Sequence, residues 1–233
     1  MSRASYAQRV DGTIQQPGSR AERRDRATAE TRAAILDAAR ECLLKEGHAN
    51  LSTRRVAEIA GVPLSQIHYH FGSRLQLILA VLAAENERLI ERQRSMFDTP
   101  EPLWVRWELA CDYLDADVAS GYVRILQEMI AAGWADADVA ASVRALVGEW
   151  YRLLADVARR EQERGSDLGG FTPEEVAALM GMPFLGAEEL ILLGVSEDVL
   201  PMRSALRKIG LLLRRVAAVP EPEPADDSIP TAR

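Results

Sequence analysis

Apolar residues recur three or four positions apart from about residue 28 to residue 218, which is the spacing of one face of an α-helix. Runs of alternating apolar and polar residues, which mark half-buried strands, are nearly absent, and the helix formers Ala, Leu, Glu and Arg are frequent. The pattern therefore predicts an all-α fold of about nine helices.

Glycine, proline and capping residues divide this pattern into separate helices. Gly47, Gly61 and Gly72 each follow a periodic segment as helix stops. Ser73, with Gln76 three residues later, predicts a capping box at the start of a long helix. The predicted helices cover about residues 28–46, 52–60, 63–71, 73–95, 103–115, 121–132, 137–164, a segment that opens at Thr172 and has a kink or break near Pro183, and 200–218.

Composition and charge narrow the class of protein. The chain of 233 residues is 48% hydrophobic and 27% charged, with two cysteines, no apolar leader and no apolar run of membrane-spanning length. These features predict a soluble cytoplasmic protein without a disulfide framework. The net charge of −7 disfavours a polyanionic partner, but residues 1–78 carry 12 Lys and Arg against 8 Asp and Glu. The charge of the whole chain therefore does not exclude nucleic acid.

The segment from Leu51 to Phe71 predicts two short helices that meet at Gly61, where the missing Cβ permits the sharp turn of a helix-turn-helix unit. At about 100° per residue, Leu64, Ile67 and Phe71 share the inward face of the second helix. The opposite face is polar and aromatic, which suits contacts with base edges, although a plain antiparallel helix pair would leave such a face in water. The residues on that face are Ser65, Gln66, Tyr69 and His70.

Five sequence pieces in this N-terminal region occur together without a gap. They are Ile35-Leu36-Asp37-Ala38-Ala39 followed by Gly47, Ser52-Thr53-Arg54-Arg55-Val56-Ala57, Ala60-Gly61-Val62, Tyr69-His70-Phe71 and Ser73-Arg74. In this pattern, over about residues 28–82, the chain resembles the tetracycline-repressor (TetR) family of bacterial transcription regulators. The resemblance implies an N-terminal DNA-binding domain followed by a divergent all-helical domain.

The resemblance also implies DNA contacts, residue by residue. Ser52 and Thr53 match positions that cap the second helix and touch phosphate. Arg54 matches a position that reaches a base in some members, and Arg74 matches the cation that grips phosphate at the start of the fourth helix. The recognition-helix contacts match Ser65, Gln66, Tyr69 and His70.

Several further candidates for DNA contact stay open. The chain departs from the family's usual residues at His48, Leu64 and His68. Leu64 is either a core residue or an apolar contact to a thymine methyl, and a phosphate contact of His68 is undecided. The basic residues Arg23, Arg24 and Arg26 either lead into the first helix as solvated charge or lie along phosphates as a flexible arm.

All four tryptophans fall between positions 104 and 150. They and their apolar neighbours either fill the core or, as the resemblance implies, line a pocket between helices for a small effector. Cys111, Gln127 and Glu128 are candidate polar anchors in that pocket. The predicted pocket residues are Trp104, Trp107, Cys111, Tyr122, Met129, Trp134, Trp150 and Tyr151.

The last two predicted helices carry more apolar surface than one small domain needs, which predicts a four-helix bundle between two copies of the chain. Two-fold symmetry would place the second helix-turn-helix about one helical turn along a palindromic operator. The predicted interface residues are Leu185, Leu206, Ile209, Gly210 and Leu213.

These features predict four regions. We expect residues 1–26 to be a disordered arm containing arginines, and residues 27–78 to be the helix-turn-helix domain, whose fourth helix continues to about residue 95 as a connector. Residues 96–218 are expected to form a helical ligand-binding and dimerisation domain, and residues 219–233 a disordered acidic tail.

We therefore expect a ligand-responsive DNA-binding regulator: a repressor that binds double-stranded operator DNA as a homodimer and is released by a small apolar or aromatic effector. An all-helical protein-binding module or an enzyme without DNA binding is the alternative, but no catalytic motif favours an enzyme. The adjacent carboxylates Glu188 and Glu189 look like solvated charge. His68 and His70 point about 200° apart and cannot share an ion, so we expect no metal site, and we expect no cofactor and no membrane partner.

Overall fold

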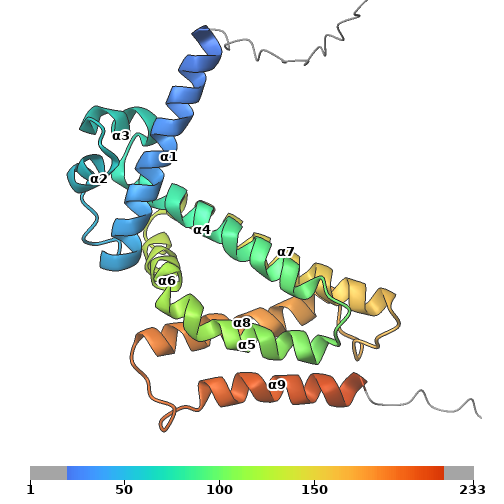
Figure 1. The fold of residues 1–233 in the computed structure, drawn as a ribbon. Helices are drawn as coiled ribbons and strands as arrows, with labels where there is room; N and C mark the ends of the chain where they lie inside the picture. The colour runs from blue at the N-terminus through green and yellow to red at the C-terminus, as the bar shows by residue number, and fades with distance from the viewer. Residues whose placement is uncertain (1–19, 218–233) are drawn as a thin grey trace, which may run out of the picture.

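The computed structural model describes residues 20–217, and within this range the chain forms nine α-helices and no strand, which confirms the predicted all-α fold (Figure 1). Helices α2 and α3 lie beside α1 in a small N-terminal lobe, and α4 leads from this lobe into a larger helical body. None of the described helices is long and apolar enough to cross a membrane. The helices are α1 (Arg20–Glu46), α2 (Thr53–Ala60), α3 (Leu64–Phe71), α4 (Arg74–Phe97), α5 (Leu103–Ala119), α6 (Tyr122–Gly133), α7 (Ala137–Glu163), α8 (Pro173–Leu192) and α9 (Met202–Ala217).

Helix α1 begins at Arg20, so the predicted disorder of residues 20–26 is wrong. From residue 19 to residue 46 the sequence contains neither glycine nor proline and is rich in Arg, Ala and Glu, which favour helix even without burial. Arg26 also pairs with Glu30 one turn later at 2.9 Å. The remainder of the predicted arm and the whole predicted acidic tail lie outside the described residues.

Two other local predictions change in detail. Ser73 caps α4 by accepting a hydrogen bond from the Gln76 N–H, but its own N–H donates to the carbonyl of Phe71, so only half of the predicted capping box forms. Thr172 opens α8 with a complete capping box, as predicted. Helix α8 continues through Pro183 to its end, so the predicted break does not occur.

The first hydrophobic core joins α1–α4 to α6 and the beginning of α7. Leu43 of α1 and Ile125 and Met129 of α6 are all at most 1% exposed and belong to this one cluster. The core therefore crosses the predicted boundary near residue 95, and α6 packs with the helix-turn-helix as well as with the body.

The second core fills the body between the end of α4 and helices α5, α7, α8 and α9. Trp107, which is 1% exposed, lies within this core: its indole N–H donates to the carbonyl of Leu206 at 2.7 Å, and its ring meets Phe184 edge-on. A buried ion pair between Arg106 and Glu161, 2.5 Å apart, joins α5 to α7. These contacts fix the helices that surround the pocket described below.

Candidate nucleic-acid interface and effector pocket

The turn between α2 and α3 fixes how α3 is presented. Ser52 caps α2 by accepting a hydrogen bond from the Arg55 N–H. Gly61 ends α2 in the left-handed region at φ +66°, a conformation that favours glycine although a Cβ there would meet open space. Val56 of α2 and Ile67 of α3 are both fully buried in the first core. One face of α3 is therefore held inward and the other is left outward.

The outward face of α3 is the one that the periodicity predicts. Tyr69 is 72% exposed, and its ring lies edge-on to that of His70, with centroids 4.9 Å apart. Ser65 is exposed, whereas Gln66 and His70 are half-buried. This face carries a hydroxyl, a phenol, an amide and an imidazole, the groups that hydrogen-bond to base edges.

The structure places the open candidates on α3 between core and solvent. Leu64 is half-buried and packs against the first core. His68 is exposed, and its Nδ1 lies 3.3 Å from the carbonyl oxygen of Gly72. Thr53 is half-buried and Arg54 exposed at the start of α2.

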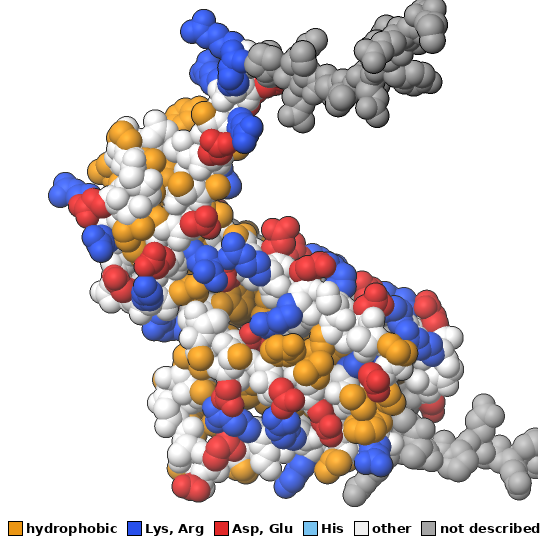
Figure 2. Space-filling model, viewed as in Figure 1, with side chains coloured by type: hydrophobic (Ala, Val, Ile, Leu, Met, Phe, Trp, Pro, Cys, Tyr) orange, Lys and Arg blue, Asp and Glu red, His pale blue; other side chains and the backbone are white. Residues whose placement is uncertain are grey.

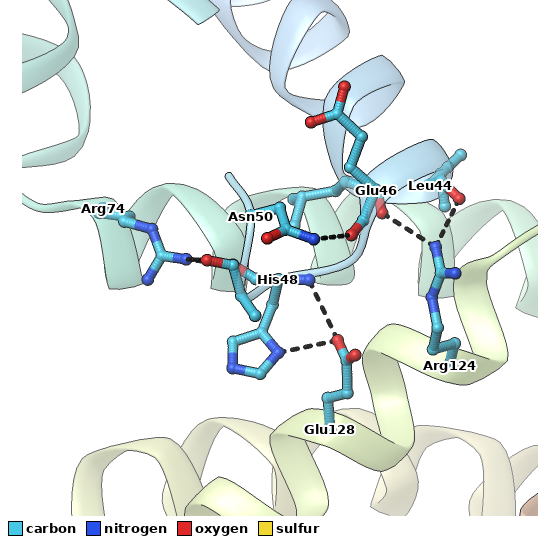
Figure 3. A network of polar contacts seen from close by, with 9 residues as sticks. Leu44, Glu46, His48, Asn50, Arg74, Arg124 and Glu128 are labelled. Carbon is cyan, nitrogen blue, oxygen red and sulfur yellow. Dashed lines mark hydrogen bonds and ion pairs between the residues drawn. The ribbon is translucent and has the colours of Figure 1, made fainter. Parts of the chain in front are cut away.

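Arg74 is exposed and bonds the protein's own α1–α2 loop, and its predicted contact with phosphate stays a prediction (Figure 3). Its Nε donates to the carbonyl of Leu51 at 2.8 Å, and its Nη2 donates to those of His48 and Ala49. Because these nitrogens bond backbone carbonyls, the side chain holds the loop before α2.

The same loop is held from its other side by α6 (Figure 3). Glu128 Oε2 accepts a hydrogen bond from the His48 N–H at 3.1 Å and lies 2.8 Å from His48 Nδ1. Arg124 Nη2 donates to the carbonyl of Leu44 at 2.8 Å. We call these contacts of Arg124 and Glu128 with residues 43–48 the α6 clasp. The prediction that Glu128 is a polar anchor in the pocket is therefore wrong.

Basic side chains gather where the first turns of α1 project beyond α2 and α3 (Figure 2). Arg20, Arg24 and Arg26 are exposed there, with Arg23 among them. The predicted cluster thus lies on a helical extension, next to the lobe that contains the helix-turn-helix.

A pocket lies in the body between α4, α5, α6, α7 and α8, with about 770 Å³ of empty space that is partly open to solvent. Of the predicted lining residues, Trp107, Tyr122 and Trp150 line it. Trp150 is fixed by a hydrogen bond of 2.7 Å from its Nε1 to Gln93 Oε1.

The other predicted lining residues lie elsewhere. Trp134 is 82% exposed, and Met129 is buried in the first core. Cys111 lines a separate, smaller pocket beside α9. Trp104 lies under the guanidinium of Arg214, and Tyr151 packs against Gly181 of α8. Helical spacing places large residues on one stripe but does not say which neighbouring helix covers that stripe.

The polar side chains that line the pocket were not predicted from the sequence. They are Asn86 and Gln93 on α4, Asp117 on α5 and Glu188 on α8. Glu188 does not behave as the solvated charge predicted for it. It follows Phe184 by four residues, and this spacing on an apolar helix was the available signal. Gln127, a predicted anchor, instead donates to the carbonyl of Leu185.

Burial shifts the titration of the groups around this pocket. It raises the pKa of Glu188 to about 8, with the charge of Asp117 as a smaller contribution in the same direction. The pKa of Asp117 is also raised by burial, although the hydrogen bond from Arg92 opposes that shift. Burial likewise raises the pKa of the Tyr122 phenol, which donates to Asn86 Oδ1 at 3.0 Å. Burial in the pocket thus favours the uncharged form of Glu188, whereas Arg92 supports the charged form of Asp117.

The residues predicted to form the dimer interface face the interior of their own chain. Leu206 is 3% exposed, and a Cβ on Gly210 would lie 3.0 Å from Trp107. Ile209 and Leu213 pack against the second core, and Leu185 lines the pocket. Leu206 and Gly210 are therefore buried in their own chain, whereas Leu185, Ile209 and Leu213 are half-buried, and the intersubunit contact of these residues stays a prediction.

Similarity to known proteins agrees with this arrangement. Residues 35–81 match the model of a family described as bacterial regulatory proteins, tetR family. The HTH-type transcriptional regulator TtgR of Pseudomonas putida is 30% identical over 103 residues, which are 43% of this chain and 49% of that protein. A probable regulator of Pseudomonas putida, ArpR, matches equally, so the chain spans about half the length of the curated relatives that it matches.

Solved structures share the fold over more of the chain. A putative TetR-family transcriptional regulator from Rhodococcus sp. has a TM-score of 0.64 at 22% identity and covers 79% of this chain and 98% of its own. A putative transcriptional regulator from Saccharomonospora viridis, in complex with choline, has a TM-score of 0.63 at 19% identity, with 78% and 95% covered.

A helix-turn-helix lobe in front of an all-helical body is the arrangement that this chain shares with these solved structures. The family match falls on the helix-turn-helix itself, and the two curated relatives are named as regulators of this type. Residues 35–81 of this chain are therefore similar to the tetR family of bacterial regulatory proteins, and the described residues share the fold of solved structures named as members of that family.

Proposed function

We propose that this chain is a ligand-responsive repressor that binds a palindromic operator as a homodimer and releases it when a small molecule occupies the pocket. One observation carries the proposal: α6 lines the pocket through Tyr122, Val123 and Leu126 and holds the helix-turn-helix lobe through the α6 clasp. A ligand that displaces α6 would therefore act directly on the position of the lobe.

The DNA contacts follow from the presentation of α3. We assign base contacts to Ser65, Gln66, Tyr69 and His70 of α3, because this face is supported from behind by the first core and is uncovered among the described residues. Thr53 and Arg54 at the start of α2 and the basic turns of α1 would contact phosphate.

A second copy of the chain is the proposed partner of the exposed faces of α8 and α9. Leu179 and Met182 of α8 are 51% and 55% exposed, and Leu211 and Leu212 of α9 are 49% and 58% exposed. Four large apolar side chains on two neighbouring helices favour a four-helix intersubunit bundle. One helix-turn-helix reads only a few base pairs, so the second copy also supplies the other half-site.

DNA binding is tested by gel shift with DNA from upstream of the gene that encodes this chain. We expect Tyr69→Ala and Gln66→Ala each to weaken binding by about 1–3 kcal/mol and to change sequence preference. The matched control is Trp134→Ala, which removes an exposed aromatic residue outside the helix-turn-helix and should bind like the wild type. Equal binding by all four proteins would contradict the recognition-helix assignment.

The dimer is tested by sedimentation equilibrium on the full chain. We expect Met182→Glu to yield monomers and to lose the shifted DNA complex, because it places a charge in the proposed bundle. Trp134→Glu, the same kind of change at an exposed site outside the bundle, should remain dimeric. If both variants stay dimeric, the α8–α9 interface is wrong.

A further inference from the structure

The pocket has an unbalanced supply of polar groups. Its lining contains two carboxyl side chains, Asp117 and Glu188, and among the described residues that line it none is Lys or Arg. The two amide side chains are already engaged: Asn86 accepts from the Tyr122 hydroxyl and donates to Glu149, and Gln93 accepts from Trp150. An anionic ligand would find no positive charge on this lining.

The two carboxyl groups are not equivalent. Arg92 Nη2 lies 2.7 Å from both oxygens of Asp117, so that charge is neutralised within the protein. Glu188, in contrast, has no hydrogen bond and no ion pair with any described residue, although its neighbours on the lining are Phe184 and Leu185. Glu188 is half-buried, and an acidic group without a partner in partly apolar surroundings is one that a bound cation would stabilise in its charged form.

The walls of the pocket suit the rest of such a ligand. Phe97, Trp107, Tyr122, Trp150 and Phe184 contribute aromatic rings. The indole N–H groups of both tryptophans are tied to protein oxygens, so these rings are held in place before a ligand arrives. Aromatic faces attract organic cations and also cover apolar groups.

We propose that the pocket binds an organic cation with an apolar body, such as an alkylammonium, and that Glu188 is the carboxylate that pairs with its charge. The inference rests on the proposed function only in that the same pocket is the effector site; the binding chemistry can be measured without DNA.

The proposed ion pair predicts that Glu188 releases a proton when the cation binds. Because burial raises the pKa of Glu188 to about 8, its protonated form is favoured at pH 7. A bound cation favours the carboxylate, so Glu188 gives up its proton to the buffer as the ion pair forms. The other ionisable groups that face this region are Asp117 paired with Arg92, Tyr122, Glu85 paired with Arg40 and Arg88, and Glu149 bonded to Asn86.

The test is isothermal titration calorimetry of the full chain with three ligands that share one alkyl chain: decyltrimethylammonium, decanol and decanoate. We expect the cation to bind at least about tenfold more tightly than decanol, and decanoate to bind most weakly. Repeating the cation titration at pH 7 in phosphate and in Tris should reveal the release of nearly one proton for each cation bound.

The variant Glu188→Gln keeps the size of the side chain and removes its charge. We expect it to lose the tenfold preference and the proton release while binding decanol as the wild type does. Glu189→Gln is the matched control, since this carboxyl is the adjacent one on α8 and is exposed. Decanol binding as tight as that of the cation, or a cation affinity unchanged in Glu188→Gln, would overturn the proposal.

The test of the ligand's charge can succeed or fail independently of the test of the proposed function. If the cation binds through Glu188 but does not release DNA in the gel shift, the site is right and the ligand-responsive repressor is wrong. If decanol or decanoate binds more tightly than the cation and releases DNA, the repressor stands and the inference about ligand charge fails.

Discussion

Gly121 is the position at which a single methyl group should weaken the contact between the helix-turn-helix lobe and α6. It precedes α6 with φ +87°, and a Cβ built there would lie 2.5 Å from the carbonyl oxygen of Leu44 on α1. That oxygen is the acceptor for Arg124 in the α6 clasp. Gly121→Ala therefore combines an unfavourable backbone conformation with a clash against backbone.

The expected magnitude is the sum of two costs. The left-handed conformation costs an alanine about 1–2 kcal/mol. Displacing the Leu44 carbonyl weakens its hydrogen bond from Arg124, a half-exposed contact worth about 1 kcal/mol. We expect Gly121→Ala to lower the free energy of unfolding by about 2–3 kcal/mol.

Urea unfolding of Gly121→Ala and Gly194→Ala separates the two costs. Gly194 has a similar φ of +79°, but nothing lies within 4 Å of its Cβ position, so this control should lose only about 1–2 kcal/mol. The midpoint should shift at constant m-value if the native state keeps its compactness. Equal losses in the two variants would refute the reasoning, because the clash with Leu44 would then cost nothing.

Three further predictions concern the core, the clasp and pH. Trp107→Ala should lower the free energy of unfolding by about 3–5 kcal/mol, because Trp107 is buried, and Trp134→Ala by less than about 0.5 kcal/mol, because Trp134 is exposed. Similar losses of stability in thermal unfolding of the two variants would show that Trp107 is not buried. Glu128→Ala should lower the free energy of unfolding by about 1 kcal/mol, since the contacts of Glu128 with the protein are half-exposed. It should also weaken the effect of ligand on DNA affinity in a gel shift. Glu87→Ala removes an exposed carboxyl group on α4 and should change neither the stability nor the effect of ligand. The folded chain holds the Glu188 proton more tightly than the unfolded chain, so the free energy of unfolding should fall as pH rises from about 4.5 to about 8. Glu188→Gln should reduce this dependence of the unfolding free energy on pH across the same range. An unchanged pH dependence would count against the raised pKa.

The recognition face could be predicted from sequence because its determinants are local. The stop at Gly61 and the inward spacing of Ile67 and Phe71 fix both the ends of α3 and its orientation. The start of α1 was misjudged for a different reason: the arginine-rich segment from Arg20 lacks apolar periodicity, yet without a helix breaker it extends the helix outward into solvent.

The pocket and the interface could be predicted only in part, because a stripe on one helix does not name its partner. Leu206 and Gly210 form the stripe that a dimer would need, but the helix that covers it is α5, through Trp107. The role of Glu188 depends in the same way on which face of α8 is turned inward. The spacing of residues along one helix does not predict which distant segment of the chain packs against it.

The arrangement of α6 also determines how large a difference in ligand affinity the proposed function requires. Tyr122, Val123 and Leu126 face the pocket, whereas Arg124 and Glu128 lie on the opposite face of the same short helix, so α6 cannot shift as a unit at the pocket without shifting at the clasp. The clasp consists of a few half-exposed polar contacts, each worth about 1 kcal/mol. A ligand that binds the displaced state roughly tenfold to a hundredfold more tightly than the clasped one supplies about 1.4–2.7 kcal/mol, which is enough to compete with such contacts. In the proposed function, a modest difference in ligand affinity between the two states is therefore enough to displace α6 from the α1–α2 loop.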